Sequence, residues 1–450
     1  MAIEGLKRVL GLAEVTFIAI GMTIGGGIFV FTGIVLRITG PALPIAYGLA
    51  WIPILVSMFP LAMLAAAIPT TGGNYRYPSR MVSRGLAFTG VWVYALATFF
   101  GQIPLYAITC GRFVHAVFPG VSPLLFAAGL VTLLCVINVL GVKLAAQVQG
   151  VMVVVLALAI LYYGVQGPLH FDPSRFEGML HPGAGNLLLG TALLSFTYLG
   201  SNGLIELGGE IREPGRVIPR AILITFPVVA TLYLLVAVTT LNAAPWQTTI
   251  LAEEPVIDTA RASLGSLGFV VFMMGGAVLA LLTTLNAIFI LGTKSLLVII
   301  DDGLLPRVLG TINRRFGTAH WLLLAVWAIA MVGLASGFPL ETFADYAALG
   351  SIIIFIPVLC AALVLPRRYP AQYAAASFKL TGFWFWFCPV VGIATSLFFA
   401  LVILADLHSA WKTAFFWLFV FSGWGYYALR VRALARHGVR PTGTALPWTT

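Results

Sequence analysis

The sequence is poor in charge: Asp, Glu, Lys and Arg make up 9% of its 450 residues. Soluble globular domains carry about 25% charged residues. Hydrophobic residues instead make up 60% of the chain. This composition excludes a soluble domain and predicts an all-α polytopic membrane protein embedded in the lipid bilayer, with short loops and no large extramembrane domain.

Cysteine and histidine are also scarce, with four and six residues, and neither shows the spacing of metal ligands. A membrane enzyme would need His, Cys or acidic clusters at mid-depth, and a channel would need repeated filter loops or a charged ring. The sequence has none of these patterns. We therefore expect no enzyme, no bound metal and no cofactor, while a non-transporting sensor of the same fold stays an alternative.

Apolar runs long enough to cross a bilayer, which takes roughly 20 residues, recur along the chain. We predict twelve spans, at residues 12–37, 41–67, 86–115, 122–142, 146–166, 185–208, 217–243, 264–299, 320–337, 342–365, 384–406 and 411–430.

The positive charges are distributed unevenly between alternate loops. One side holds 20 of the 25 Lys and Arg residues and the other holds 5. Because cytoplasmic loops collect Lys and Arg, both termini are predicted to be cytoplasmic. The net charge of +10 is then an orientation signal and does not indicate nucleic-acid binding.

The middle of the first span is rich in glycine, with the sequence GMTIGGGIF at residues 21–29. Each glycine costs a helix about 1 kcal/mol relative to alanine. Irregular backbone at membrane depth is tolerated only where protein buries it or where it lines a cavity. Two interpretations follow: a broken helix that binds a ligand, or close helix packing through the small pair Gly21 and Gly25.

The sixth span has a matching interruption, because the small and polar residues 200–203 (GSNG) stand at its middle. Two glycine-interrupted spans in corresponding positions are typical of an inverted-repeat transporter and favour the binding interpretation. We predict a 5+5 inverted repeat of residues 1–166 and 185–366 with discontinuous helices 1 and 6. Two further spans, 11 and 12, lie within residues 380–432.

Four motifs make the chain similar to the amino acid–polyamine–organocation (APC) transporter family, and they come in the family's order. They are GGGIF at residues 25–29, PTTGGNYRY at 69–77, EIREPGRVIPRAI at 210–222 and DDGLLP at 301–306. The resemblance covers nearly the whole chain. It implies an amino acid permease that works by alternating access.

The broken helices fit a zwitterionic substrate, since free N–H groups at a helix start attract a carboxylate and free carbonyls accept from an ammonium. The resemblance assigns the carboxylate to the N–H groups of Gly26 and Gly27. It assigns the amine to the carbonyls of Thr23, Phe196 and Leu199. Phe196 also matches the family's gating aromatic, and the breaks add Ile24, Gly25, Thr197 and Gly200 to the expected site.

Several polar residues leave alternatives open. Gln102 and Asn286 either touch the substrate side chain or form hydrogen bonds between helices. Glu206 either meets a cationic substrate group, carries a proton, or pairs with an arginine such as Arg76 or Arg80.

Three charged residues near the inner loops are expected to have structural roles. Glu210 and Glu213 are expected to pair with neighbouring arginines, and Lys294 to extend to the cytoplasmic face.

The coupling ion, Na⁺ or H⁺, is not determined by the sequence. Proton-coupled relatives carry a lysine in span five, where this chain has Leu156, which argues against that mechanism. Thr283 and Thr284 offer hydroxyl ligands to a small cation. The alternatives are a proton on Glu206 or an exchanger without an ion.

The prediction is therefore a secondary active amino acid transporter, a monomer or homo-oligomer of the cell membrane. A polyamine or organic-amine transporter, or an amino acid exchanger, is the alternative.

Overall fold

The computed structural model describes residues 8, 10–179, 183–252, 255–313, 315–406 and 410–436. For residues 116, 117, 142–148 and 196 the description covers the backbone alone. Within these residues the regular elements are helices. Two isolated β-bridges also form, between Leu10 and Ile211 and between Thr71 and Leu207.

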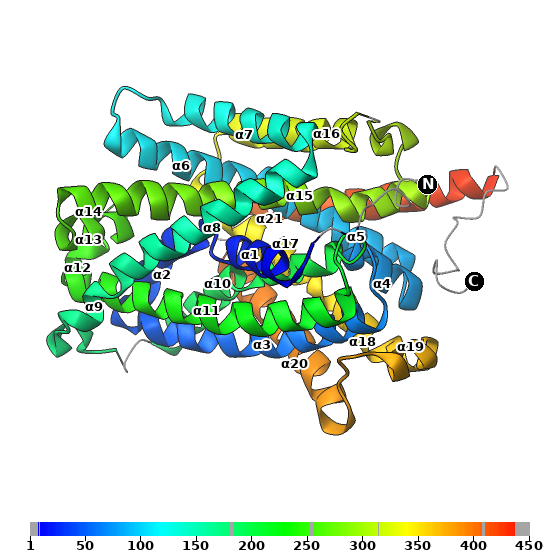
Figure 1. The fold of residues 1–450 in the computed structure, drawn as a ribbon, viewed down its shortest axis with the longest axis horizontal. Coiled ribbons are helices and arrows are strands. Elements are labelled where there is room, and N and C mark those ends of the chain that lie inside the picture. Colours follow the sequence, from blue (N-terminus) through cyan, green and yellow to red (C-terminus); the bar gives the residue numbers. More distant parts are fainter. Residues whose placement is uncertain are drawn as a thin grey trace.

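The α-helices follow one another with short connections (Figure 1). They are α1 Leu12–Thr23, α2 Gly27–Thr39, α3 Leu43–Ala67, α4 Gly73–Met81, α5 Arg84–Ala95, α6 Ile103–Val117, α7 Pro123–Leu140, α8 Val142–Gly164, α9 Gln166–Leu169, α10 Ala184–Thr197, α11 Pro214–Ala243, α12 Trp246–Thr249, α13 Pro255–Ser263, α14 Ser266–Val271, α15 Leu279–Asp301, α16 His320–Ala335, α17 Leu340–Ile353, α18 Phe355–Arg368, α19 Pro370–Ala375, α20 Gly382–Asp406 and α21 Ala410–Arg436.

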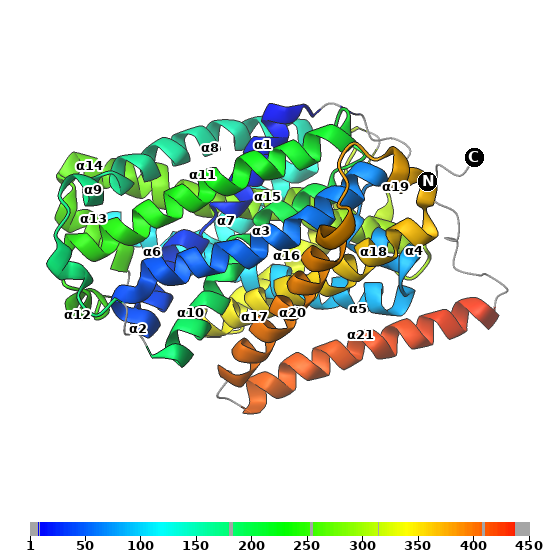
Figure 2. The ribbon, with the colours of Figure 1, turned by 90° about the horizontal axis from the view of Figure 1, so that it is seen from below.

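The long helices run along the bundle, and short helices gather at its two ends (Figures 1 and 2). Helices α9, α12 and α13 lie at one end, here named the α13 end, and α4 and α19 lie at the other, the α4 end. Helix α1 packs against α8, α11 and α15.

Within the described residues, nine helical stretches are long and apolar enough to cross a membrane. One of them, Leu12–Ala67, has 56 residues and contains three helices, α1 to α3. Helices lie on all twelve predicted ranges, but α16 has only 16 residues. The multi-pass helical architecture is confirmed, whereas the count of twelve and the inverted repeat stay predictions.

Two spans contain a π-helical segment, which widens the turn and is frequent at functional sites. Leu96–Gln102 joins α5 to α6, and Phe272–Val278 joins α14 to α15. These are the third span of each predicted repeat, spans three and eight. The second half of the chain thus matches the first in its π segments as well as in its broken helices.

Candidate functional site

The first span breaks where its glycines predict. Helix α1 ends at Thr23 and α2 begins at Gly27. Within the described backbone, no carbonyl accepts from the N–H groups of Gly25, Gly26 or Gly27, whereas Ile28 donates to Gly25 and Phe29 to Gly26. The start of α2 therefore offers free donors at the positive end of a helix dipole.

The sixth span breaks slightly earlier than predicted. Helix α10 ends at Thr197, two residues before the expected end at Leu199. The remainder, Leu199–Glu206, is a 3₁₀ helix, named η4, and not the α-helical inner half that we expected. Small residues favour this outcome, since Gly200, Ser201, Asn202 and Gly203 are weak helix formers.

The two breaks touch each other directly. A Cβ atom added to Gly200 would lie 2.5 Å from the carbonyl carbon and oxygen of Met22 and 2.6 Å from the Cα of Thr23. These neighbours are backbone atoms, which cannot rotate away. Gly200 is therefore the residue that lets the end of α1 approach the start of η4.

A small cavity lies between the breaks, with a volume of ≈ 40 Å³. A buried water occupies about 10–15 Å³ by this measure, so the cavity holds a few waters and must widen to admit an amino acid. Its lining comes from both breaks and from spans three, eight and ten: Met22, Thr23, Gly25, Gly27, Tyr94, Gln102, Tyr106, Thr197, Leu199, Gly200, Asn202, Thr284, Ile288 and Ser351.

The cavity brings together eight of the residues predicted from the sequence, whereas five other predicted residues lie outside its lining: Ile24, Gly26, Glu206, Thr283 and Asn286. Ile24 and Thr283 are fully buried beside it. Phe196, the predicted gate, lies in the last turn of α10, and its side chain is outside the described atoms. Gln102 ends the π segment of span three and contacts the hydroxyl of Tyr106 at 3.4 Å.

The central glycines also serve close packing, which was the alternative interpretation of the glycine run. A Cβ on Gly25 would lie 1.7 Å from Oγ1 of Thr284, and a Cβ on Gly26 would lie 2.1 Å from Cδ2 of Leu281. Both neighbours belong to α15. The glycine run therefore lets α15 approach the break, while the N–H groups of the same residues keep no backbone acceptor.

Tyr233 is a site residue that the sequence analysis missed. It is fully buried on α11, and its hydroxyl donates to the carbonyl of Thr23 and, at 3.2 Å, to that of Thr197. One phenol thus joins the last carbonyls of α1 and α10. Its ring packs between Tyr47 and Tyr198, at 5.5 and 5.1 Å between centroids. A lone tyrosine in an apolar span carries no sequence signal for this role.

Asn286 is held in a chain of amides between helices. Its Nδ2 donates to Oε1 of Gln149 at 3.1 Å, and its Oδ1 accepts from Nδ2 of Asn138 at 2.9 Å. Gln149 Nε2 in turn donates to the carbonyl of Thr283 at 3.1 Å. These contacts favour the interhelical role for Asn286.

Gln149 was also missed. A Cβ on Gly21 would lie 2.7 Å from its Nε2, so Gln149 lies where span five meets spans one and eight. The hydroxyls of Thr283 and Thr284 both donate to the carbonyl of Ala280, at 2.9 and 3.1 Å.

Glu206 holds helix α4 in place. Its Oε1 accepts from the backbone N–H of Asn74 at 2.8 Å, and both carboxylate oxygens lie 2.9 Å from Oγ of Ser295. Its backbone carbonyl accepts from Gly72 at 3.2 Å. Among the described residues no arginine pairs with Glu206, so the predicted pairing with Arg76 or Arg80 is wrong. Glu206 does not line the central cavity.

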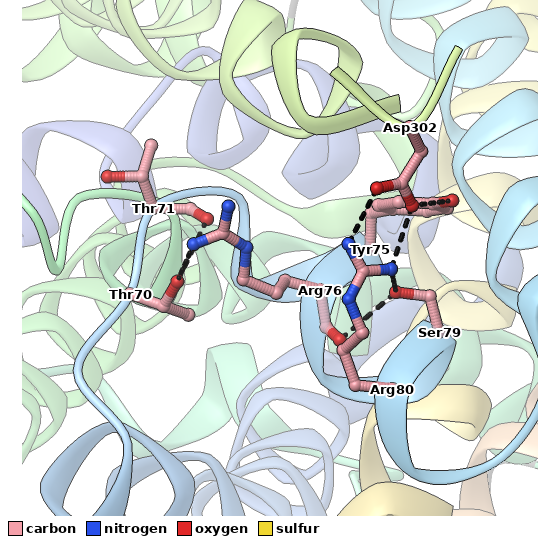
Figure 3. Close-up of polar contacts among 7 residues, drawn as sticks. All are labelled: Thr70, Thr71, Tyr75, Arg76, Ser79, Arg80 and Asp302. Atoms are coloured by element: carbon pink, nitrogen blue, oxygen red, sulfur yellow. Dashed lines mark hydrogen bonds and ion pairs between the residues drawn. The ribbon is translucent and has the colours of Figure 1, made fainter. Parts of the chain in front are cut away.

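The arginines of α4 have other partners (Figure 3). Arg80 forms a two-pronged ion pair with Asp302, at 2.6 and 2.7 Å, and Tyr75 donates to the same carboxylate at 2.8 Å. Arg76 donates to Thr70 at 2.9 Å. Burial raises the pKa of Tyr75, and the negative charge of Asp302 adds to this rise, so the phenol stays a donor.

A second buried ion pair corrects two predictions. Lys294 does not extend to the membrane face: it is 5% exposed, and its Nζ lies 2.5 Å from Oε1 of Glu210. Glu210 thus pairs with a lysine instead of an arginine, while Glu213 pairs with Arg216 at 3.6 Å as expected. Removal of either partner of this pair would leave an uncompensated buried charge, which is strongly destabilising.

Comparisons with known proteins cover almost the whole chain. A family model described as "Amino acid permease" matches residues 14–428. The branched-chain amino acid permease BcaP of Bacillus subtilis (strain 168) is 23% identical over 91% of this chain and 90% of its own. The methylthioribose transporter of the same organism is 26% identical, over 87% of each chain. The vacuolar cationic amino acid transporter 4 of Arabidopsis thaliana is 24% identical over 80% of this chain and 63% of its own.

Proposed function

Since the chain belongs to the amino acid permease family, we propose that it is a secondary active transporter that moves an amino acid by alternating access. The family and the relatives are transporters, so the chain is a multi-pass membrane transporter and not an enzyme. The observation that carries the proposal is the cavity lined by the breaks of both discontinuous helices.

The substrate carboxylate binds at the start of α2. The N–H groups of Gly25, Gly26 and Gly27 lack acceptors in the described backbone, and a helix start carries roughly half a positive charge. Glycine offers no hydroxyl here, so the backbone alone recognises the carboxylate.

The substrate ammonium binds at backbone carbonyls of the two breaks. These are the carbonyls of Thr23 at the end of α1, Phe196 in the last turn of α10 and Leu199 at the start of η4, to which the end of α10 adds Thr197. Each carbonyl has two lone pairs, so the ammonium shares Thr23 and Thr197 with the hydroxyl of Tyr233. Binding of one zwitterion then joins the two breaks.

The substrate side chain is neutral. All side chains that line the cavity are uncharged, among them Met22, Gln102 and Ile288. Glu206, which kept a basic amino acid or a polyamine as an alternative, has its carboxylate bound by Asn74 and Ser295 outside the lining. A neutral amino acid therefore fits this lining better than a cationic one.

Uptake into proteoliposomes tests the proposal, with labelled neutral, basic and acidic amino acids and a polyamine. Each is measured with and without a sodium gradient and a pH gradient, which separates Na⁺ coupling, H⁺ coupling and exchange. We expect uptake of a neutral amino acid. Acceptance of the polyamine alone, which has no carboxylate, would overturn the proposal.

A variant pair tests the backbone assignment. Gly26→Val places a side chain against Leu281 of α15 and should abolish substrate binding. Gly129→Val is the control, because nothing lies within 4 Å of a Cβ at Gly129. Normal binding by folded Gly26→Val protein would refute the role of the Gly26 backbone.

A further inference from the structure

The three threonines that line the central cavity have hydrogen-bond partners within their own helices. The hydroxyls of Thr23, Thr197 and Thr284 each donate to a backbone carbonyl three or four residues earlier, at 2.7, 2.7 and 3.1 Å. Serine and threonine side chains in helices commonly form this contact. These three hydroxyls are therefore satisfied without a ligand.

Two other polar side chains of the lining lack such a partner. Asn202 belongs to η4 and is 6% exposed, and Ser351 belongs to α17 and is 5% exposed. No described residue forms a hydrogen bond with either side chain. Burial of a carboxamide or a hydroxyl without a hydrogen bond is costly. Both groups therefore need a partner inside the cavity.

Ser201, the neighbour of Asn202, differs in this respect. Its hydroxyl is fully buried and also lacks a hydrogen bond within the described chain, but Ser201 does not line the cavity. The polar atoms of Asn202 and Ser351 keep accessible surface, and both residues line the cavity. A molecule in the cavity can thus reach Asn202 and Ser351 but not the hydroxyl of Ser201.

Gln102 adds a third polar group from another span. Its Nε2 lies 3.4 Å from the hydroxyl of Tyr106, which is long for a hydrogen bond between nitrogen and oxygen. Spans three, six and ten thus each bring one amide or hydroxyl to the same cavity. A carboxamide and a hydroxyl can both donate and accept. Together these three groups match a polar group without charge.

We propose that Asn202 and Ser351, together with Gln102, bind the side chain of the substrate and select a short side chain that carries a hydroxyl or a carboxamide. The inference rests on the proposed function, because it takes the transported amino acid as the ligand and places its head group at the two helix breaks.

The selection follows from the cost of unpaired polar groups. An apolar side chain would displace water from Asn202 and Ser351 and leave both without a partner, whereas a hydroxyl or a carboxamide replaces the water. A site that forms hydrogen bonds with a substrate group rejects the analogue that lacks this group. Because the cavity has a volume of only ≈ 40 Å³, a short side chain requires the least widening.

Pairs of amino acids with the same shape test this selection. L-Threonine and L-valine differ by a hydroxyl in place of a methyl group, and L-asparagine and L-leucine form a second pair of similar size. Initial rates of uptake into proteoliposomes are measured for each labelled amino acid at the same low concentration. We expect the polar member of at least one pair to enter about tenfold faster or more. Equal or faster uptake of the apolar member in both pairs would overturn the inference.

Variants show whether the proposed residues cause the preference. Asn202→Leu and Ser351→Ala remove the polar group with little change in size, and each should lower the ratio of polar to apolar uptake about tenfold. Ser201→Ala is the matched control, because it removes a hydroxyl that does not reach the cavity, and it should leave the ratio unchanged. A ratio that keeps its wild-type value in both Asn202→Leu and Ser351→Ala would overturn the assignment.

The ratio is independent of the amount of folded protein, since both rates are measured on one preparation. For a variant without uptake, the rise in unfolding temperature that each amino acid produces in detergent replaces the rate. The two proposals fail separately. Wild-type uptake of neutral amino acids without a preference for the polar members refutes the side-chain subsite alone, whereas absence of uptake of every amino acid refutes the proposed function and the subsite with it.

Discussion

Replacement of Gly25 by alanine adds one methyl group at the point where span one meets span eight. The added Cβ would lie 1.7 Å from Oγ1 of Thr284, 2.8 Å from its Cβ and 3.0 Å from its Cγ2. Carbon atoms in contact are normally about 3.5–4.0 Å apart. A new rotamer of Thr284 moves Oγ1 and Cγ2 but leaves Cβ in place, so the break of span one and α15 must separate.

The expected cost follows from this geometry. Overpacking of a tight core typically costs about 1–3 kcal/mol, and here the separation also moves the N–H groups that we assign to the carboxylate. Gly129 of α7 provides the control, since a Cβ there meets nothing within 4 Å. Gly129→Ala should be neutral or stabilise the protein by up to about 1 kcal/mol through helix propensity.

A double-mutant cycle measures the contact directly. Thermal unfolding of the purified protein and amino acid uptake are compared for Gly25→Ala, Thr284→Ala, Thr284→Gly and the two doubles. Thr284→Ala leaves the Cβ at 2.8 Å and should rescue Gly25→Ala in part. Thr284→Gly removes all three clashing atoms and should rescue it further, with a coupling of about 0.5–3 kcal/mol.

The result that refutes the reasoning is additivity. If Gly25→Ala costs the same with threonine or glycine at position 284, the close approach of the break to α15 does not exist in the protein. If Gly25→Ala unfolds at the same temperature as Gly129→Ala, the glycine at the break is not required for packing.

Three further predictions concern the polar contacts. Tyr233→Phe removes the donor shared by the two helix ends and should lower uptake about tenfold, because an unsatisfied buried group costs about 1–3 kcal/mol. Tyr162 is half-exposed on α8, so the control Tyr162→Phe should leave uptake unchanged. Equal uptake by both variants would contradict the role of Tyr233 as a bridge. Asp302→Asn breaks the buried ion pair with Arg80 and should lower the free energy of unfolding by about 3–5 kcal/mol, measured by thermal unfolding. An unchanged unfolding temperature would argue against a contribution of this ion pair to stability. Asn286→Ala should destabilise the protein by about 0.6–1.7 kcal/mol without altering the order in which amino acids are transported, and an altered order would make it a substrate contact.

The glycine run shows why one sequence pattern supported two interpretations. Thr284 and Leu281 occupy the space that side chains at Gly25 and Gly26 would need. The N–H groups of the same two residues have no acceptor within the described backbone. Packing and binding use different sides of the same residues. Periodicity and composition describe the side chains alone, so they cannot separate the two uses.

Charged residues near the α4 end were the least predictable part. The sequence offered arginine partners for Glu210 and, as one alternative, for Glu206, and it suggested that Lys294 extends to the cytoplasmic face. The contacts that these three residues make depend on how α4, η4 and α15 meet. In the structure Glu210 forms an ion pair with Lys294, and Glu206 accepts hydrogen bonds from the N–H of Asn74 and the hydroxyl of Ser295. Similar Coulomb energies make these pairings equivalent until burial and distance are known.

The sequence by itself determined the multi-pass helical class, the break of span one and the region of the break in span six. A span must be apolar because lipid surrounds it, and glycine weakens a helix at whatever position it occupies. Both effects depend on the local sequence alone. The tertiary structure decided the contacts across those breaks. Gly200 packs against Met22, Tyr233 donates to two carbonyls, and Gln149 of span five contacts spans one and eight. These residues lie far apart along the chain, and only the packing of the helices brings their atoms into contact.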